Sequence, residues 1–219
     1  MSQEDAASVL VSQVLSALVI GGSLTVKVPV IRNLVQLKSG DVLSITALYL
    51  EYVAVSLLIV YQVLLGSPLA AWAELLSIQV QNTILVLLLW HYGHAPARTR
   101  LIAAVCFGMI VFGAINIPAK WRWVCPIATT CIGAVGSTSQ ISANWKHGHT
   151  GALSLFTQTL NVVGMGSRIY TTLYLVKDTV AVLTQCVTFS LHSVLLLQVW
   201  FMRSATARLA EKNKASKSD

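Results

Sequence analysis

Residues 42–65 read VLSITALYLEYVAVSLLIVYQVLL, a run of 24 positions in which Glu51 is the only charged residue. An α-helix crosses a bilayer core about 30 Å thick with ~20 apolar residues. Apolar side chains fall on every face of such a helix here, whereas a surface helix of a soluble domain keeps one polar face. The stretch therefore predicts a membrane-spanning helix.

The composition of the whole chain agrees with a membrane protein. Of its 219 residues, 55% are hydrophobic and only 11% are charged, and the mean hydropathy is +0.71. Soluble globular domains carry about 25% charged residues. So few ionisable groups could not cover the surface of a water-soluble domain of this size. The composition also argues against a disordered chain or a disulfide scaffold.

Six further apolar stretches resemble residues 42–65 in length and composition. The connections between them hold Gly, Pro and charged residues, and they are too short to contain a folded extramembrane domain. We therefore predict an all-α integral membrane protein with seven transmembrane helices, at residues 9–26, 42–65, 72–89, 101–117, 124–141, 153–176 and 179–201.

The distribution of basic residues predicts the orientation of these helices. If the N-terminus lies outside, eleven of the fifteen Lys and Arg residues fall on the inner side, three fall on the outer side, and Arg168 lies within the sixth span. Cytosolic loops carry such an excess of basic residues, and all six Trp residues lie at predicted span ends, where headgroups accommodate indole rings. Because the basic C-terminal tail explains much of the net charge of +7, we do not expect nucleic-acid binding.

The chain contains a weak internal repeat. Residues 29–44 align with residues 139–154 at an offset of 110 positions, and each segment holds a helix end, a polar loop, a turn and the start of an apolar span. We expect two parallel three-helix repeats, related by an axis along the membrane normal. They would occupy residues 9–92 and 120–202, with a loop and linker helix at 93–119, a short N-terminus at 1–8 and a basic cytosolic tail at 203–219.

Several motifs resemble a known family. Residues 26–29 (VKVP) with 37–40 (LKSG), and the run 148–154 (GHTGALS) preceded by Asn144 and followed by Arg168, are similar to the two loops of PQ-loop membrane proteins, above all the mannose-P-dolichol utilization defect family. The Pro-Gln pair itself is divided between the repeats, as Pro29-Val30 in the first and Ser139-Gln140 in the second.

The resemblance implies a fold and a function. The fold is the 3+1+3 arrangement of SWEET and cystinosin-type transporters. The function is use of dolichol-phosphate-mannose and dolichol-phosphate-glucose in the lumen of the endoplasmic reticulum, for N-glycans and GPI anchors. The partners implied are dolichol-phosphate-linked sugars, membrane lipids and lumenal glycosyltransferases. The resemblance leaves open whether the protein reorients the lipid-linked sugar or only presents it.

Ionisable residues inside a membrane mark candidate sites, because each costs at least ~2.5 kcal/mol to insert. Glu51, Arg168 and His192 lie within predicted spans. Arg168, a planar donor, suits a phosphate. The alternative for Glu51 and Arg168 is a structural ion pair or a bond to a neighbouring helix, and His192 reads as a core residue. Asn161 aligns with Glu51 in the repeat.

The inner ends of the helices supply further candidates. Pro29 lacks a backbone N–H and would open the first helix, so that Lys27 beside it could meet a lipid phosphate or simply extend to the interface. Gln140 could bond the carbonyls freed by such a bend. Gln81 belongs to a polar cluster in the third span, which either bonds neighbouring helices or lines a site for sugar hydroxyls. Asn144 completes the candidate substrate-binding residues.

Three functions remain open from the sequence. The first is binding, with or without reorientation, of dolichol-phosphate sugars. The second is transport of a small solute, a sugar or an amino acid, by alternating access, and the third is a non-transporting adaptor for glycosyltransferases. We expect no enzyme activity, metal or cofactor, because the chain shows no nucleotide loop, nucleophile motif or paired metal-ligand spacing.

Overall fold

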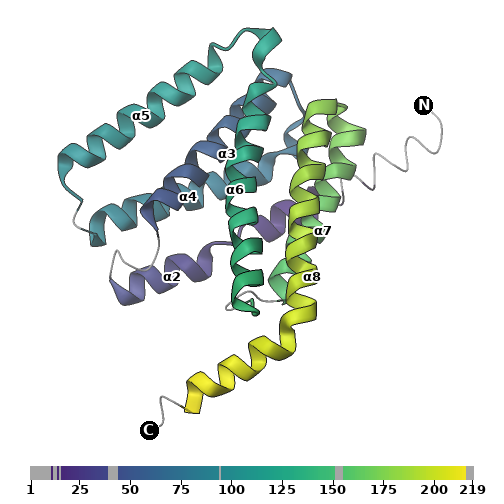
Figure 1. The fold of residues 1–219 in the computed structure, drawn as a ribbon. Coiled ribbons are helices and arrows are strands. Elements are labelled where there is room, and N and C mark those ends of the chain that lie inside the picture. The colour runs from purple at the N-terminus through teal and green to yellow at the C-terminus, as the bar shows by residue number, and fades with distance from the viewer. Residues whose placement is uncertain are drawn as a thin grey trace.

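The computed structural model describes residues 11, 14, 16–38, 44–93, 95–150 and 155–215, with side chains for all of these except 37, 156, 157 and 205–215. All regular structure in these residues is helical (Figure 1). A first helical segment at 16–23 precedes α2 (Val28–Leu37), α3 (Ile45–Leu65), α4 (Ala73–Tyr92), α5 (Ala97–Ile115), α6 (Val124–His147), α7 (Leu155–Thr171) and α8 (Thr179–Ala215). Two short 3₁₀ turns, η2 (Leu69–Ala71) and η3 (Ala119–Trp121), and the π-helical η4 (Thr172–Val176) complete the set.

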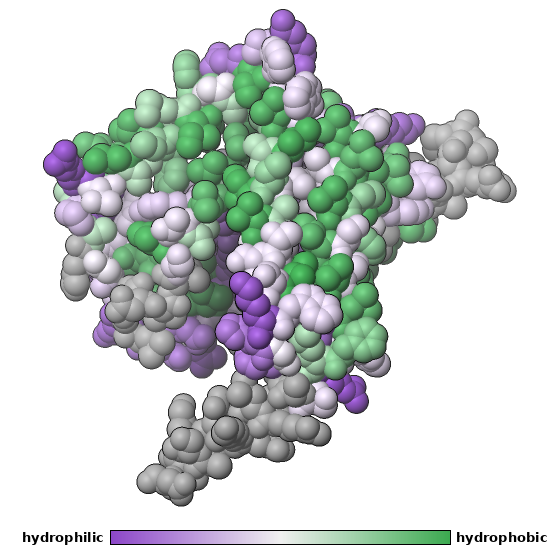
Figure 2. Space-filling model, viewed as in Figure 1, coloured by the Kyte–Doolittle hydropathy of each residue, from purple (hydrophilic) through white to green (hydrophobic). Residues whose placement is uncertain are grey.

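Five helices of the described residues are long and apolar enough to cross a membrane: Ser16–Gln36, Ile45–Leu65, Ala73–Tyr92, Ala97–Ile115 and Thr179–Ser204. These correspond to the predicted first, second, third, fourth and seventh spans. The predicted fifth and sixth spans are helical but are not among the five, since α6 has a polar second half and α7 has 17 residues. One face of the molecule is mostly hydrophobic between more polar ends (Figure 2), and the chain is a multi-pass membrane protein.

The first predicted span has different limits in the structure. The helix does not end at Val26 before a loop, because residues 24–27 form a turn and α2 continues the helical path to Leu37. Pro29 lies in the first turn of α2, where its missing N–H costs nothing and its fixed φ suits the helix. The start of this span at 9–10, the predicted turn at Gly40-Asp41 and the run at 151–154 lie outside the described residues.

The other helices keep their predicted order with shifted ends. Ser44 caps α3 by accepting a hydrogen bond from the Ala47 N–H at 3.3 Å, and Gly66, with φ of 71°, ends it in the left-handed conformation. The predicted fifth span ended at residue 141, but α6 runs to His147, where Gly148 with φ of 69° terminates it. The predicted tail at 203–219 begins inside α8, which extends to Ala215.

Helix α3 is central to the packing. It contacts α4, α5 and α6, while α8 contacts both α6 and α7, and α2 contacts α4. Helix α5 runs along the outside of the bundle (Figure 1). One apolar cluster, around Leu34, Leu48 and Leu85, joins α2, α3 and α4. A second cluster, around Tyr61, Cys125 and Ala181, joins α3, α6 and α8, so that the early and late helices meet along α3 and α6.

Candidate functional site

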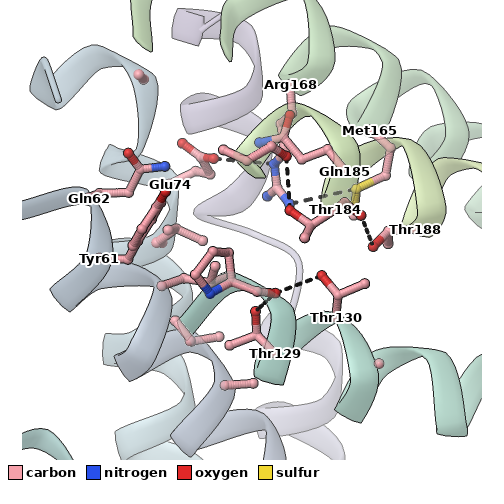
Figure 3. Close-up of a pocket in the computed structure, with 18 residues that line it drawn as sticks. Tyr61, Gln62, Glu74, Thr129, Thr130, Met165, Arg168, Thr184, Gln185 and Thr188 are labelled. Atoms are coloured by element: carbon pink, nitrogen blue, oxygen red, sulfur yellow. Dashed lines mark hydrogen bonds and ion pairs between the residues drawn. The ribbon is translucent and has the colours of Figure 1, made fainter. Parts of the chain in front are cut away.

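A cavity of about 190 Å³ lies between α3, α4, α6, α7 and α8, and we call it the central cavity. Its polar lining comes from Gln62 on α3, Glu74 on α4, Thr129 and Thr130 on α6, Arg168 on α7, and Thr184, Gln185 and Thr188 on α8 (Figure 3). Helices from both ends of the sequence therefore build one chamber, in which these polar groups stand among apolar side chains such as Val55, Leu58 and Leu75. It lies toward the end of the bundle where α3 ends and α4 begins, which the basic-residue distribution predicts to be the lumenal end.

Among the described residues that line the central cavity, the one acid and the one base form an ion pair. Arg168 Nε lies 3.2 Å from Glu74 Oε1, and the two side chains are 25% and 6% exposed. This geometry leaves the Nε–H without a hydrogen-bond acceptor in the described residues, and one terminal nitrogen, NH1, lies 4.0 Å from the Met165 sulfur. The guanidinium is thus held by charge, and its buried Nε–H makes no hydrogen bond to the described residues.

The remaining polar atoms of the cavity are mostly hydrogen-bond acceptors. The hydroxyls of Thr129 and Thr130 donate to the Pro126 carbonyl at 2.9 and 2.8 Å, so their oxygens keep acceptor capacity. Thr184 and Thr188 bond back along α8 in the same way. The Oε1 atoms of Gln62 and Gln185 are buried without a partner in the described part of the chain. A solute bearing several N–H or O–H donors and one anionic group complements this lining.

Tyr61 ties the cavity wall to the start of α8. Its hydroxyl donates to Asp178 Oδ1 at 2.9 Å, and the same carboxylate oxygen accepts from the Ala181 N–H at 2.7 Å. Asp178 follows η4, the π-helical end of α7. This contact fixes the junction of α7 and α8 against α3, and so it fixes the walls between which Arg168 and Glu74 meet.

Lys27 and Glu51 form a second ion pair, separate from the central cavity. Lys27 Nζ lies 2.6 Å from the Glu51 carboxylate. Both residues therefore have charged partners on a neighbouring helix, as the structural alternative predicted for Glu51. Glu51 is not paired with Arg168, which bonds to Glu74 instead.

Gln81 bridges the break in the first helix. Its Oε1 accepts the Lys27 N–H at 2.9 Å, and its Nε2 donates to the Ser23 carbonyl at 2.8 Å. In a continuous helix the Lys27 N–H would bond directly to the Ser23 carbonyl. The side-chain amide thus replaces one backbone hydrogen bond, which assigns Gln81 a helix-bridging role in this conformation, away from the central cavity.

The predicted second-repeat residues form a chain of amides at the end of α6. Gln140 Nε2 donates to Asn144 Oδ1 at 2.9 Å, and Asn144 Nδ2 donates to Gln198 Oε1 at 2.8 Å. Gln198 in turn donates to the Ile141 carbonyl at 3.1 Å. Asn144 is 2% exposed, so this network holds α6 against α8, and Gln140 contacts a side chain where a freed carbonyl was expected.

Of the predicted site residues, only Arg168 lines the central cavity. Pro29 is exposed in α2, and Asn161 lines a different, more apolar cavity beside α7. Sequence reasoning missed Glu74, because an acidic residue in the first turn of a helix is ordinary. Cavity residues such as Gln62 and Thr129 carry no charge and follow no motif, so the sequence held no signal for them.

Comparison with known proteins finds a relative among the solute carriers. The chain is similar to Solute carrier family 66 member 3 of Homo sapiens, with 26% identity over 163 residues that cover 73% of this chain and 78% of that protein. No protein-family model and no solved structure matches the chain. Similarity to a solute carrier agrees with the second function left open by the sequence, transport of a small solute. It gives no support to a closer relationship with the mannose-P-dolichol utilization defect family.

Proposed function

We propose that this protein is a membrane carrier that moves a small polar solute through the central cavity by alternating access. The observation that carries the proposal is the cavity itself, a chamber with charged and polar groups among apolar side chains, between α3 and α4 on one side and α6, α7 and α8 on the other. Polar residues at such depth in a membrane mark substrate pathways. The similarity to a solute carrier supports the same function, and a carrier requires no catalytic group.

The lining favours an amino acid or a sugar as the solute. Arg168 can bind a carboxylate in a bidentate manner, Glu74 can accept from an ammonium group, and the threonine and glutamine oxygens can accept from hydroxyl or amine donors. A cavity of about 190 Å³ is smaller than the 300 Å³ or more typical of drug-sized ligands. A solute with few heavy atoms therefore fits the chemistry and the size together.

The architecture that we propose for this carrier is the 3+1+3 arrangement of PQ-loop proteins, with a lumenal N-terminus and a cytosolic C-terminus. Three facts support it. Helices α3 and α7 begin at Ile45 and Leu155, which is the offset of 110 positions found in the sequence repeat. The contacts of α6 and α7 with α8 join the last three helices. The outer position of α5 (Figure 1) suits a linker helix.

Transport by the reconstituted protein tests the proposal. Gly133 lines the central cavity, and a Cβ added there would have no atom within 4 Å. We expect Gly133→Leu to fill the cavity and to lower exchange of labelled amino acids or monosaccharides in proteoliposomes at least about tenfold, the effect of about 1.4 kcal/mol. Arg168→Lys, which keeps the charge and loses the bidentate geometry, should raise the KM for an anionic solute.

The matched control is Gly108→Leu. Gly108 also has no atom within 4 Å of an added Cβ, but it lines a groove between α3, α4 and α5. Its transport rate should equal that of the wild type. Equal loss of transport in Gly108→Leu and Gly133→Leu, or unchanged transport in both, would contradict a solute path through the central cavity.

A second candidate function, handling of dolichol-phosphate sugars in the endoplasmic reticulum, is supported by the Arg168 guanidinium, which suits a phosphate and whose Nε–H has no acceptor in the described residues. It is tested in cells that cannot use dolichol-phosphate-mannose, by scoring truncated lipid-linked glycans after expression of this chain. Restored glycans would favour this function. Truncated glycans together with solute exchange in proteoliposomes would leave the carrier as the sole proposal.

A further inference from the structure

A second cavity lies on the other side of Arg168, and we call it the lateral cavity. It measures about 380 Å³ and is formed by the first helix, α4 and α7. Arg168 and Met165 line both cavities, whereas the other members of the lateral lining are mostly apolar. We propose that the lateral cavity binds one acyl chain of an anionic glycerophospholipid, and that the lipid phosphate replaces Glu74 as the ion-pair partner of Arg168.

The surroundings of the lateral cavity identify a hydrocarbon chain as its occupant. Leu18 and Val26 on the first helix, and Leu160 and Val163 on α7, line it and are each more than half exposed. In a membrane protein such side chains face lipid. The groove is therefore open to the acyl chains of the bilayer, and water gains little from occupying an apolar space.

The size of the groove fits an acyl chain. Along α7 its lining extends from Leu160 to Arg168, a rise of about 12 Å over eight steps of 1.5 Å. Gly22 and Gly164 line it, and a Cβ added at either position would have no atom within 4 Å. The lateral cavity is thus long enough for part of an acyl chain, and no side chain at these two glycines obstructs it.

The charge at one end of the groove selects an anionic headgroup. Among the described lining residues Arg168 alone is charged, while Ser23 and Ser167 donate their hydroxyls to the Ile20 and Val163 carbonyls. The Arg168 guanidinium makes no hydrogen bond to its partner Glu74 through Nε. Phosphate oxygens accept two parallel hydrogen bonds from a guanidinium, which a single long ion pair does not provide.

The consequence of lipid binding concerns the central cavity. Because Arg168 lines both spaces, a phosphate that pairs with it releases the Glu74 carboxylate into the central cavity. The lipid would thereby change the charge that a solute meets there. This inference goes beyond the carrier function and stands without it, since lipid binding is measured directly and needs no transported solute.

The test uses the purified full-length chain in detergent with defined lipids. We expect native mass spectrometry to show palmitoyl-oleoyl-phosphatidylglycerol retained about tenfold more strongly than the phosphatidylcholine of the same chains, the effect of about one charge-assisted hydrogen bond. Gly164→Leu, which fills the lateral cavity, should abolish the preference. Gly108→Leu, which fills the groove between α3, α4 and α5, and Gly133→Leu, which fills the central cavity, should keep the preference.

A second measurement does not depend on any variant. Phosphatidylglycerol with a photoreactive diazirine in one acyl chain should label wild-type residues 16–26 and 160–167. Labelling confined to α5, equal retention of the two lipids, or an unchanged preference in Gly164→Leu would overturn the proposal. Thermal stabilisation by glycerol phosphate equal to that by phosphatidylglycerol would also overturn it, because that result would show an anion-binding site without a binding site for the acyl chain.

Discussion

The two ion pairs of this protein join the same kinds of groups in different surroundings. Lys27 and Glu51 meet beside the break in the first helix, with side chains 15% and 43% exposed. Arg168 and Glu74 meet inside the central cavity, with side chains 25% and 6% exposed. The first pair is short, at 2.6 Å, and the second is longer, at 3.2 Å.

The difference teaches that distance alone does not rank the pairs. A half-exposed carboxylate that water or lipid headgroups can reach is still solvated when its partner is removed, so such a pair contributes little to stability. A buried carboxylate without its partner is an uncompensated charge. We therefore expect loss of one partner to destabilise the protein more for the longer pair, Arg168 and Glu74, than for the shorter one. Because Arg168 Nε makes no hydrogen bond to Glu74, Arg168 can also pair with another anion.

The largest expected effect comes from Arg168→Gln. The change leaves the buried Glu74 without a cation and should lower the free energy of unfolding by about 3 kcal/mol, measured by denaturant unfolding in detergent. The double variant Arg168→Gln/Glu74→Gln removes the orphaned charge and should recover at least half of the loss. If the double variant is less stable than the single one, the two residues do not form the coupled pair described above.

An intermediate effect is expected from Gln81→Leu, which sharpens the comparison by testing what positions Lys27. The substitution leaves the Lys27 N–H and the Ser23 carbonyl without the amide between them, at a cost of about 2 kcal/mol. Hydrogen exchange of the Lys27 amide should accelerate accordingly. Gln79→Leu is the matched control, since Gln79 lies on the same helix and its side chain donates to the Ser56 hydroxyl and not to the first helix in the described part of the chain; it should leave Lys27 exchange unchanged.

The smallest effect is expected from the Lys27–Glu51 pair. A double-mutant cycle of Lys27→Gln and Glu51→Gln should give a coupling energy of about 0.5 kcal/mol, because Glu51 is 43% exposed in the first third of α3. Salt at 1 M should reduce this coupling, since screening acts on exposed charges. A coupling larger than that of Arg168 and Glu74 would reverse the ranking of the two pairs.

Much of the fold was predictable because membrane insertion depends on local composition. Helices α3, α4 and α5 occur where runs of apolar residues stand between Gly and Pro positions, with shifts of a few residues at their ends. The first span was predicted less well. Pro29 was taken to open a helix end, but the helix resumes directly in α2, because the Gln81 amide, 54 positions away, replaces the bond lost at Lys27.

The candidate site was predictable only in part. Arg168 was identified because a charge inside an apolar span is costly. Its partner Glu74 was not, because the two lie 94 positions apart and Glu74 occupies an ordinary place near a helix start. The sequence placed several candidates, such as Lys27 and Gln140, at the inner ends of the helices, whereas the polar groups of the central cavity are largely neutral Thr and Gln side chains toward the other end.

By itself, then, the amino-acid sequence determined that this chain is a helical membrane protein, roughly where its helices lie, and that Arg168 needs a partner. Hydropathy and the cost of burying charge are properties of short segments, and they act before the helices meet. Only the tertiary structure decided that Glu74 is that partner and that the Gln81 amide bridges the break in the first helix. It also decided that Arg168 borders both the central cavity and the lateral cavity. Those outcomes depend on which helices pack together, and no local pattern encodes that choice.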